Sequence, residues 1–377
     1  MGGRLKIGSL GGIPIYISST WIWIALLYTY FFYLRFTQQG VFISSSTAIA
    51  LAVLATLLFF GSVFVHEVAH AITARTLGLS VAGITLEFWG GRTETEAERR
   101  GPWAEFLVSA VGPGSTLVLA GLFWLASRSL ADGQAIGDLL RWLGGVNLLL
   151  AGVNAIPGFP LDGGRMFLAT VWAITGDREK ALRAAGTAGL VLGAGLGVFG
   201  VTQLSNGGGF GIWFLFLAWI LIGTSRSLRA RVQVRRILSV GRVSDAMAPA
   251  PGQVPAEMTL SQALDLFLRD NPQEVFPVVE DGRVVGAVSL ESAEAAPAAP
   301  FQSVREGMIS LAESGAISPD ERLDRAVDLI RGRRVLVFRG GDLLGSISNA
   351  DIGRWFERRS GAAPKAGDSW TPPRPDI

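Results

Sequence analysis

The sequence contains no cysteine, which excludes disulfide bonds and metal sites built on thiolates. It is also poor in histidine, with two among 377 residues, and in charge, with 17% Asp, Glu, Lys and Arg. A metal site must therefore be built from imidazole and carboxylate groups. The hydrophobic share of 49% and the mean hydropathy of +0.40 indicate a membrane protein.

The net charge is only +2, and the basic residues gather beside apolar runs instead of forming a face that binds nucleic acid. We therefore expect no nucleic acid among the partners. Apolar runs fill roughly the first 225 positions, whereas the remainder alternates charged and apolar residues as globular domains do. The chain thus combines a region solvated by lipid with a region solvated by water.

Long uncharged runs predict about six transmembrane helices, at residues 21–34, 47–79, 106–126, 139–156, 185–204 and 210–224. The short segment 5–18 is rich in glycine and β-branched residues and is predicted as a strand or a surface-lying segment. Six spans put both termini on one side, where basic residues such as Arg4 and Arg226 are concentrated. The positive-inside rule therefore predicts a multi-pass protein of the cell membrane with both termini, and the soluble region, in the cytoplasm.

The composition also predicts the limits of the domains. Residues 1–224 form the transmembrane domain, and the basic segment 225–242 is a linker or juxtamembrane helix. Two soluble halves of similar length follow at 243–292 and 301–357, separated by a stretch rich in alanine and proline. The polar tail 358–377 is predicted to be disordered.

The second predicted span holds the only two histidines of the chain, His66 and His70, together with Glu67. Histidines four apart share one face of a helix, as two ligands of one zinc ion must. Glu67 is displaced by one position, so it can exchange protons with a water that zinc makes acidic without being a ligand. A histidine pair hydrogen-bonded in a core is the alternative. Ionisable groups at membrane depth are energetically costly, which favours a functional site.

Two histidines leave a catalytic zinc ion one protein ligand short. The third ligand is expected to be a carboxylate, and Asp162 is the best candidate because the fourth span ends at Pro157 and Pro160 and then presents this single acid. Two glycines follow it and allow close approach of the backbone. A helix stop with a capping aspartate accounts for the same residues locally, but it leaves Asn154 unexplained.

The two motifs together resemble the site-2 protease family of intramembrane zinc metalloproteases, over roughly residues 5–225. That family pairs an HExxH helix with an NxxPxxPxDG segment, and both match here in the same order and on separate spans. The resemblance implies one Zn2+ per chain, held by His66, His70 and Asp162. It further implies that Glu67 activates the attacking water and that Asn154 helps to position the scissile peptide or its oxyanion.

The resemblance extends to residues without ligand chemistry. Glu105 and the later run Gly112-Pro113-Gly114 are similar to the family's third span, and we interpret them as structural because small residues permit tight helix packing. Residues 82–91 resemble a strand whose exposed edge receives an extended substrate, although a simple hairpin accounts equally well for them. The implied partners are membrane lipid and a substrate that is a single-span membrane protein or a signal peptide.

The soluble region shows the same order of elements twice, namely helix, strand, turn and strand. Strands predicted at 275–279 and 284–289 are matched by strands at 335–339 and 343–348, and the repeat resembles a pair of CBS domains. The predicted fold class is therefore a multi-pass α-helical membrane protein with a site-2 protease core, followed by an α/β CBS pair.

In CBS domains a Gly-x-x-Ser/Thr-x-x-Asp sequence contacts adenine nucleotides, and the second repeat has it as Gly345, Ser348 and Asp351. The first repeat departs from this pattern, with Ser292 in place of the acid. The resemblance implies an adenine nucleotide at the second half. A purely structural or dimerising role, with a homodimer formed through the CBS domains, is the alternative.

The functional hypothesis is an intramembrane zinc metalloendopeptidase that cleaves membrane-tethered substrates within or near their transmembrane segments and is modulated by its CBS pair. The alternative is a CBS-regulated zinc or ion transporter, because such pairs also regulate transporters and buried histidine and aspartate side chains line cation paths. Glu67 separates the two, since a cation path does not require an acid at that position beside the ligands. A catalytically inactive scaffold is disfavoured because no motif residue is missing.

Overall fold

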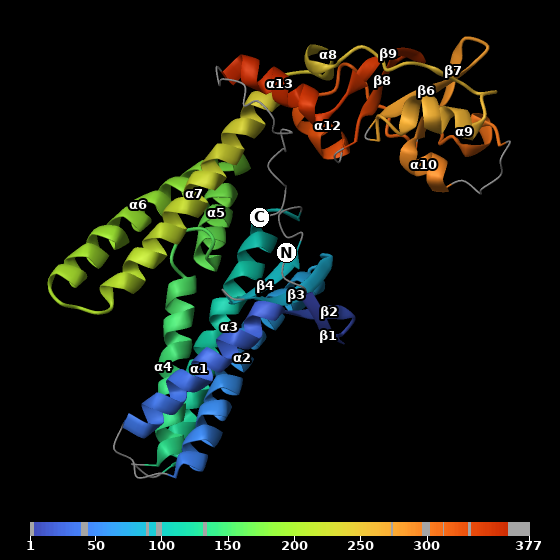
Figure 1. The fold of residues 1–377 in the computed structure, drawn as a ribbon. Coiled ribbons are helices and arrows are strands. Elements are labelled where there is room, and N and C mark those ends of the chain that lie inside the picture. The colour runs from blue at the N-terminus through green and yellow to red at the C-terminus, as the bar shows by residue number, and fades with distance from the viewer. Residues whose placement is uncertain are drawn as a thin grey trace. The chain divides into compact units, whose positions relative to one another are not determined.

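The computed structural model describes residues 4–38, 44–87, 90–95, 100–130, 134–272, 274–295, 302–311, 313–330 and 333–360. The chain divides into two compact units, Met1–Arg229 and Ala230–Ile377. The first is mainly helical with one small sheet, and the second mixes short strands and helices (Figure 1). This division agrees with a region built for lipid and a region built for water.

The first unit opens with a β-hairpin. Strands β1 (Arg4–Leu10) and β2 (Ile13–Ser18) pair antiparallel. The turn between them holds Gly11 and Gly12 at φ angles of 56° and 86°, a region that side chains other than glycine rarely adopt. The segment predicted as one strand or a surface-lying segment is therefore two paired strands.

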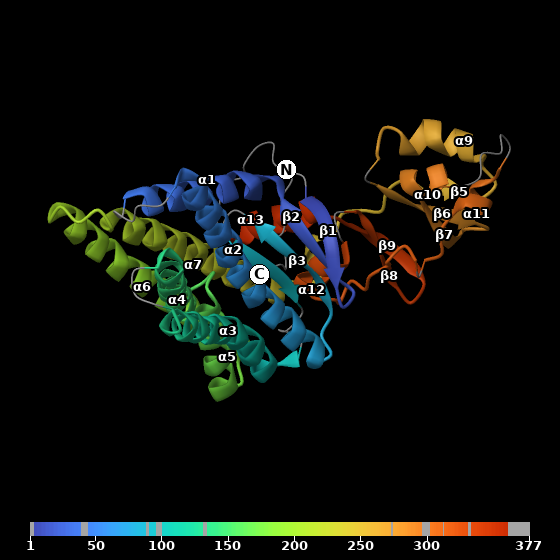
Figure 2. The ribbon, with the colours of Figure 1, turned by 90° about the horizontal axis from the view of Figure 1, so that it is seen from below.

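Two long helices, α1 (Ser19–Gln38) and α2 (Ser45–Thr76), connect this hairpin to β3 (Val81–Glu87), which pairs parallel with β2. Strand β4 (Gly90–Thr95) completes the sheet in the order β1-β2-β3-β4. Figure 2 shows β1, β2 and β3 side by side next to α2. Because β3 has neighbours on both sides, the free edges among the described strands of this sheet belong to β1 and β4, and the hairpin interpretation of residues 82–91 is confirmed.

Five described helices are long and apolar enough to cross a membrane: α2, α3 (Pro102–Arg128), α4 (Ala135–Asn154), α6 (Arg178–Ser205) and α7 (Gly211–Ser239). Helix α1, which contains the predicted first span, does not reach this apolarity because it carries two tryptophans and three of the four tyrosines. Such amphipathic rings are typical of the membrane interface.

Helix α5 (Asp162–Thr175) was not predicted, and α6 begins at Arg178 rather than near residue 185. Helix α5 has 14 residues, too few for a span, and the predicted start of α6 lies after the charged residues of its first turns. A helix continues past the apolar layer when its backbone remains hydrogen-bonded, as α6 does through its charged first turn Arg178-Glu179-Lys180.

Small residues bring α6 and α7 into close contact. A Cβ atom on Gly189 would lie 2.2 Å from the Ser225 hydroxyl oxygen, and one on Gly193 would lie 2.7 Å from the Ile222 side chain. Helices that associate in lipid commonly pack through such small residues, since the hydrophobic effect does not hold them together there.

The second unit holds two similar sheets. Strand β5 (Val254–Pro255) pairs parallel with β6 (Val275–Glu280), which pairs antiparallel with β7 (Arg283–Ser289). Strands β8 (Val335–Arg339) and β9 (Asp342–Ile347) repeat the hairpin. The four predicted strands are thereby confirmed.

Short helices surround these strands. They are α8 (Val243–Ala246), α9 (Leu260–Ala263), which continues as a π-helical turn, η2 (Leu264–Leu268), α10 (Leu290–Ala295), α11 (Val304–Gly307), α12 (Leu323–Ile330) and α13 (Asn349–Ser360). Helix α13 extends three residues into the predicted tail, and residues 361–377 lie outside the described part of the chain.

The two repeats exchange their leading segments. Val243 of α8 is buried in the core of the second repeat, and Ala248 pairs with Ser346 of β9. Val304 of α11 is buried in the core of the first repeat, and Ile309 pairs with Ala287 of β7. The segment with α8, which precedes the first repeat, packs on the second repeat. The segment with α11, which precedes the second repeat, packs on the first, so the two repeats share their cores.

Candidate metal centre and active site

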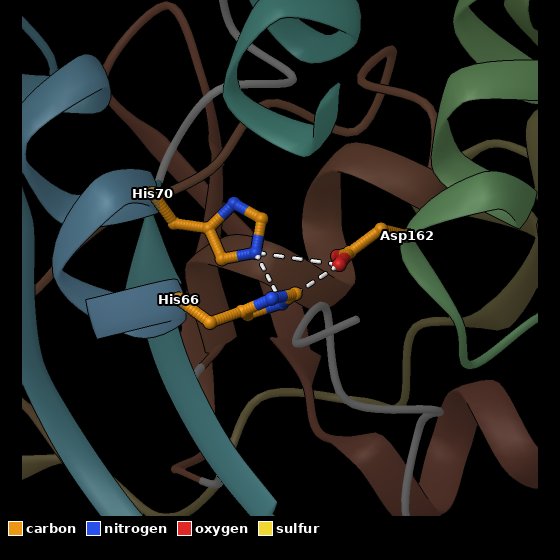
Figure 3. Close-up of side chains that lie close together, drawn as sticks. All are labelled: His66, His70 and Asp162. Atoms are coloured by element: carbon orange, nitrogen blue, oxygen red, sulfur yellow. Dashed lines mark hydrogen bonds and ion pairs between the residues drawn. The ribbon is translucent and has the colours of Figure 1, made fainter. Parts of the chain in front are cut away.

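Helix α2 carries His66 and His70 on one face, and both side chains are buried. Their Nε2 atoms lie 3.1 Å apart, with the rings nearly perpendicular at 81°. The Asp162 Oδ2 atom lies 3.0 Å from His66 Nε2 and 3.4 Å from His70 Nε2 (Figure 3). The structure thus brings together the three residues predicted as ligands, although His66 and Asp162 are 96 positions apart in the sequence.

Asp162 is the first residue of α5, after the loop that contains Pro157 and Pro160. The two glycines behind it pack directly on that loop. A Cβ atom on Gly163 would lie 2.4 Å from the Ala155 carbonyl, and one on Gly164 would lie 2.6 Å from the Gly158 carbonyl carbon. The glycines therefore let the start of α5 fold back against the residues that precede it, which aims Asp162 at the histidines.

The geometry of the three side chains fits a zinc ion. Zinc held tetrahedrally at about 2.0–2.1 Å from each ligand keeps its ligand atoms about 3.3 Å apart. The three observed separations of 3.0, 3.1 and 3.4 Å lie close to that value. Gly112 of α3 faces the two imidazoles, since a Cβ atom there would lie 2.3 Å from His70 Nε2 and 2.7 Å from His66 Nε2. The space beside both nitrogens exists because residue 112 has no side chain.

A hydrogen bond orients one of the imidazoles. His70 Nδ1 lies 2.5 Å from the carbonyl oxygen of Val108 in α3. Because a carbonyl can only accept, Nδ1 carries the proton and donates it, and Nε2 keeps the lone pair that a metal ligand needs. His66 Nδ1 is buried without a hydrogen-bond partner among the described residues. The protein thus fixes the tautomer of His70 through α3.

Glu67 and Asn154 were predicted to act beside the ligands. Glu67 is buried, with 6% of its surface exposed, on the same helical turn as the two histidines. Asn154 ends α4 and is half-buried, and its side-chain amide donates to the Leu150 carbonyl of its own helix at 3.1 Å. The catalytic role of Asn154 stays a prediction.

The residues predicted to contact a nucleotide have other partners in the structure. The buried Asp351 carboxylate accepts from the Ser348 backbone at 2.9 Å and from its hydroxyl at 2.7 Å, which caps α13. It also pairs with Arg334 at 3.2 Å and with Arg354. A Cβ atom on Gly345 would lie 2.4 Å from the Ala248 carbonyl oxygen. Each of the three residues therefore has a structural task.

The sequence does not reveal the contact partners of two residues near the candidate metal centre, Gly112 and Glu105. Gly112 was interpreted as a helix-packing residue, yet it lies against the two imidazoles. Glu105, interpreted as structural, forms a part-buried ion pair with Arg165, which lies three residues after Asp162. The sequence shows only an acid in an otherwise apolar span and a glycine about two helical turns further along, and neither reveals its partner.

Comparisons with known proteins support the same interpretation. The profile of "Peptidase family M50" matches residues 126–196, and that of "CBS domain" matches residues 243–293. The "Putative zinc metalloprotease sll0528" of Synechocystis sp. is 32% identical over 315 residues, covering 81% of each chain. The "Putative zinc metalloprotease Rip3" of Mycobacterium tuberculosis is 30% identical, covering 80% of this chain and 79% of that relative. The solved structure "Site-2 Protease from Methanocaldococcus jannaschii" aligns with a TM-score of 0.41 at 22% identity, over 59% of this chain and 94% of that chain.

The transporter alternative is not favoured, because relatives that align over most of both chains are named as metalloproteases. The helices fit a multi-pass membrane protein, and the second unit contains the matched CBS domain. The chain therefore belongs to peptidase family M50, the site-2 protease family, and is an intramembrane zinc metalloprotease with a C-terminal CBS domain.

Proposed function

We propose that His66, His70 and Asp162 hold the zinc ion of this metalloprotease and that peptide bonds of membrane-tethered substrates are hydrolysed beside them. The observation that carries the proposal is the convergence of three ligand atoms at 3.0–3.4 Å next to a residue without a side chain, Gly112. Zinc bound there supplies a Lewis acid for the scissile carbonyl and lowers the pKa of water.

The remaining roles fall to neighbouring side chains. Glu67 takes the proton from the attacking water and delivers it to the amine that leaves, as a buried carboxylate next to the ligands is able to do. Asn154 offers an amide that donates to the scissile carbonyl or its oxyanion once the substrate replaces its bond to Leu150. The Val108 carbonyl keeps His70 in the tautomer that binds metal.

The proposed substrate is a single-span membrane protein or a signal peptide, surrounded by membrane lipid. Peptide bonds inside a helix are shielded by their own hydrogen bonds, so the substrate must unwind locally before it is cut. An unwound segment needs new backbone partners, and β4, an edge strand among the described strands of its sheet, is a suitable one. Helix-breaking residues in the substrate should therefore speed cleavage.

The proposed topology has both termini and the CBS pair in the cytoplasm, with α1 as a sixth span. Twenty residues of α1 give a helix of about 30 Å, the thickness of the apolar layer. The proposed domain limits remain residues 1–224 for the protease, 225–242 for the linker, and 243–292 and 301–357 for the two repeats. Attaching a membrane-impermeant label to single cysteines, which the natural chain lacks, tests the orientation directly.

We also propose that the CBS pair modulates the protease, either by binding an adenine nucleotide at the second repeat or by forming a homodimer. Calorimetry of the intact protein with ATP, ADP and AMP tests the first arm, and light scattering in detergent tests the second. Heat of binding at saturable concentrations supports the nucleotide. If no heat of nucleotide binding is measured and light scattering gives the mass of a dimer, the CBS pair serves to form the homodimer.

The decisive experiment replaces Glu67 by Gln, which preserves shape and removes the base. The protein, in detergent or liposomes, receives a tagged single-span substrate with a Gly/Pro break, and fragments are identified by mass spectrometry. Cleavage by Glu67→Gln should fall by about a hundredfold or more while zinc content stays near one per chain. Asp162→Ala, His66→Ala and His70→Ala should lose zinc.

Glu179→Gln is the matched control, because it makes the same chemical change at an exposed ion pair with Arg183. Its cleavage and zinc content should equal those of the unchanged protein. Glu67→Gln that cleaves at the normal rate would refute the assigned base. Full zinc and activity in Asp162→Ala would refute the third ligand.

A further inference from the structure

One face of α3 contacts both histidines of the candidate metal centre and is joined by an ion pair to α5, the helix that begins with Asp162. Glu105, Val108 and Gly112 follow one another at spacings of three and four residues, which places them on one side of a helix. All three are buried. Val108 binds His70 through its carbonyl, and Gly112 lies beside both imidazole Nε2 atoms. Glu105 is the member of this face whose partner lies next to the third ligand.

Glu105 forms an ion pair with Arg165 of α5, with the Nε and Oε1 atoms 2.8 Å apart. The glutamate side chain is 3% exposed and the arginine side chain 26%. The other carboxylate oxygen, Oε2, is buried without a hydrogen-bond partner among the described residues. Because Arg165 offsets the charge of a carboxylate held away from water, loss of Arg165 leaves a buried carboxylate uncompensated.

Arg165 follows Asp162 by three residues, so the two side chains project from the same side of the first turn of α5. Anchoring Arg165 to α3 therefore fixes the rotation of this turn about its axis. That rotation decides whether the Asp162 carboxylate points at His66 and His70, since Asp162 is the first residue of the helix. The Leu161 residue before it provides no side-chain cap that would fix the turn instead.

We propose that Glu105 is a positioning residue of the metal centre, which acts through Arg165 to hold Asp162 in place for zinc. This inference rests on the proposed function, since it takes Asp162 as a zinc ligand. Glu105 itself touches neither metal nor substrate. One face of α3 then orients His70, leaves space beside both imidazoles and fixes the helix that carries the acid.

The experiment measures the zinc dissociation constant of the full-length protein in detergent by competition with a chelator. Glu105→Gln should raise this constant about ten- to a hundredfold, the usual effect of losing a group that orients a metal ligand. Arg165→Gln should do the same. The double variant should lose no more than the single ones, because the two side chains act as one unit. Glu179→Gln, which neutralises an exposed partner of Arg183, should stay within about twofold of the unchanged protein.

A merely structural ion pair gives a different result. Glu105→Gln would then lower the melting temperature of the zinc-free protein while its zinc dissociation constant stays equal to that of Glu179→Gln, and this outcome overturns the inference. If Glu105→Gln does not fold, Glu105→Asp replaces it, because the charge is kept and the arm is one methylene shorter. A several-fold rise in the constant supports the proposal, and an unchanged value overturns it.

The same assay distinguishes failure of the proposed metal site from failure of the role proposed for Glu105. An unchanged protein that binds no zinc refutes the proposed metal site itself. The role of Glu105 alone is refuted by a different result. In that result the natural protein binds zinc, Asp162→Ala does not, and Glu105→Gln binds zinc as tightly as the natural protein.

Discussion

The substitution Gly112→Ala tests the geometry of the metal centre without altering a ligand. The added methyl group would lie 2.3 Å from His70 Nε2 and 2.7 Å from His66 Nε2, and protein Cβ atoms essentially never approach another atom within 3.0 Å. The two imidazoles, or α3 itself, must therefore move. Both atoms at risk are the nitrogens that we assign to zinc.

The size of the displacement can be compared with what zinc tolerates. His70 Nε2 has to retreat by about 0.7 Å merely to reach 3.0 Å, whereas bond lengths in zinc sites vary by about 0.2 Å. A shift of α3 instead would lengthen the hydrogen bond between Val108 and His70. Either response removes a ligand from its place, so we expect the zinc dissociation constant to rise about a hundredfold or more, with cleavage lost in parallel.

Gly114→Ala is the control, since no atom lies within 4 Å of the position its Cβ would occupy on the same helix. Alanine is favoured over glycine by about 1 kcal/mol inside a helix, so this variant should be as stable as the unchanged protein or more so. Zinc competition and substrate cleavage are measured on both variants. If the Gly112→Ala and Gly114→Ala variants have the same zinc dissociation constant, the placement of α3 against the two histidines is refuted.

Two further predictions concern contacts outside the cluster. Thr224→Val keeps the shape of the side chain but removes the hydroxyl that donates to the Phe159 carbonyl at 2.5 Å, so we expect a loss of about 1–3 kcal/mol in unfolding free energy and several-fold slower cleavage. Thr187→Val loses a hydrogen bond to the Arg183 carbonyl of its own helix and should change neither the unfolding free energy nor the cleavage rate. Equal behaviour of the two variants would contradict a stabilising role for the bond between Thr224 and Phe159. Asp351→Ala removes a helix cap, whereas Arg334 keeps its ion pair with Glu274 and Arg354 is largely exposed. Denaturant unfolding of the second unit should therefore show a loss of about 1–2 kcal/mol, and a loss below about 0.5 kcal/mol would refute its structural task.

The three residues proposed as zinc ligands could be picked out from the sequence because their evidence is local. The spacing of His66 and His70 fixes a shared helical face, and the helix is read from its apolar composition. Asp162 was identified by its place after two prolines and by the resemblance of the whole segment to a known family. The contact between the two motifs spans 96 positions, and the structure places it at 3.0 Å.

The surroundings of the ligands could not be predicted, because they depend on which helix faces which. Glu105 and Arg165 are 60 positions apart, and nothing in either segment names the other as its partner. Gly112 reads as a packing residue in sequence, since small residues are common wherever membrane helices touch. Helix α5 could not be predicted as a membrane span because it holds 14 residues, too few to cross a bilayer.

Asp351 shows how a motif residue can fit two tasks that the sequence does not separate. An aspartate three positions after a serine, at the start of a helix, is the pattern of a nucleotide contact in CBS domains and also of a helix cap. The structure fills both carboxylate oxygens: Oδ2 receives the Ser348 groups and Arg334, and Oδ1 receives Arg354. In the first repeat Ser292 accepts from the Ser289 backbone at 2.9 Å, so the same cap is built there without an acid. Since capping alone does not require a negative charge at this position, the acid of the second repeat is explained by the arginines beside it. Because an ionised carboxylate offers about four lone-pair sites, a nucleotide hydroxyl that used Asp351 would share it with both arginines rather than replace them.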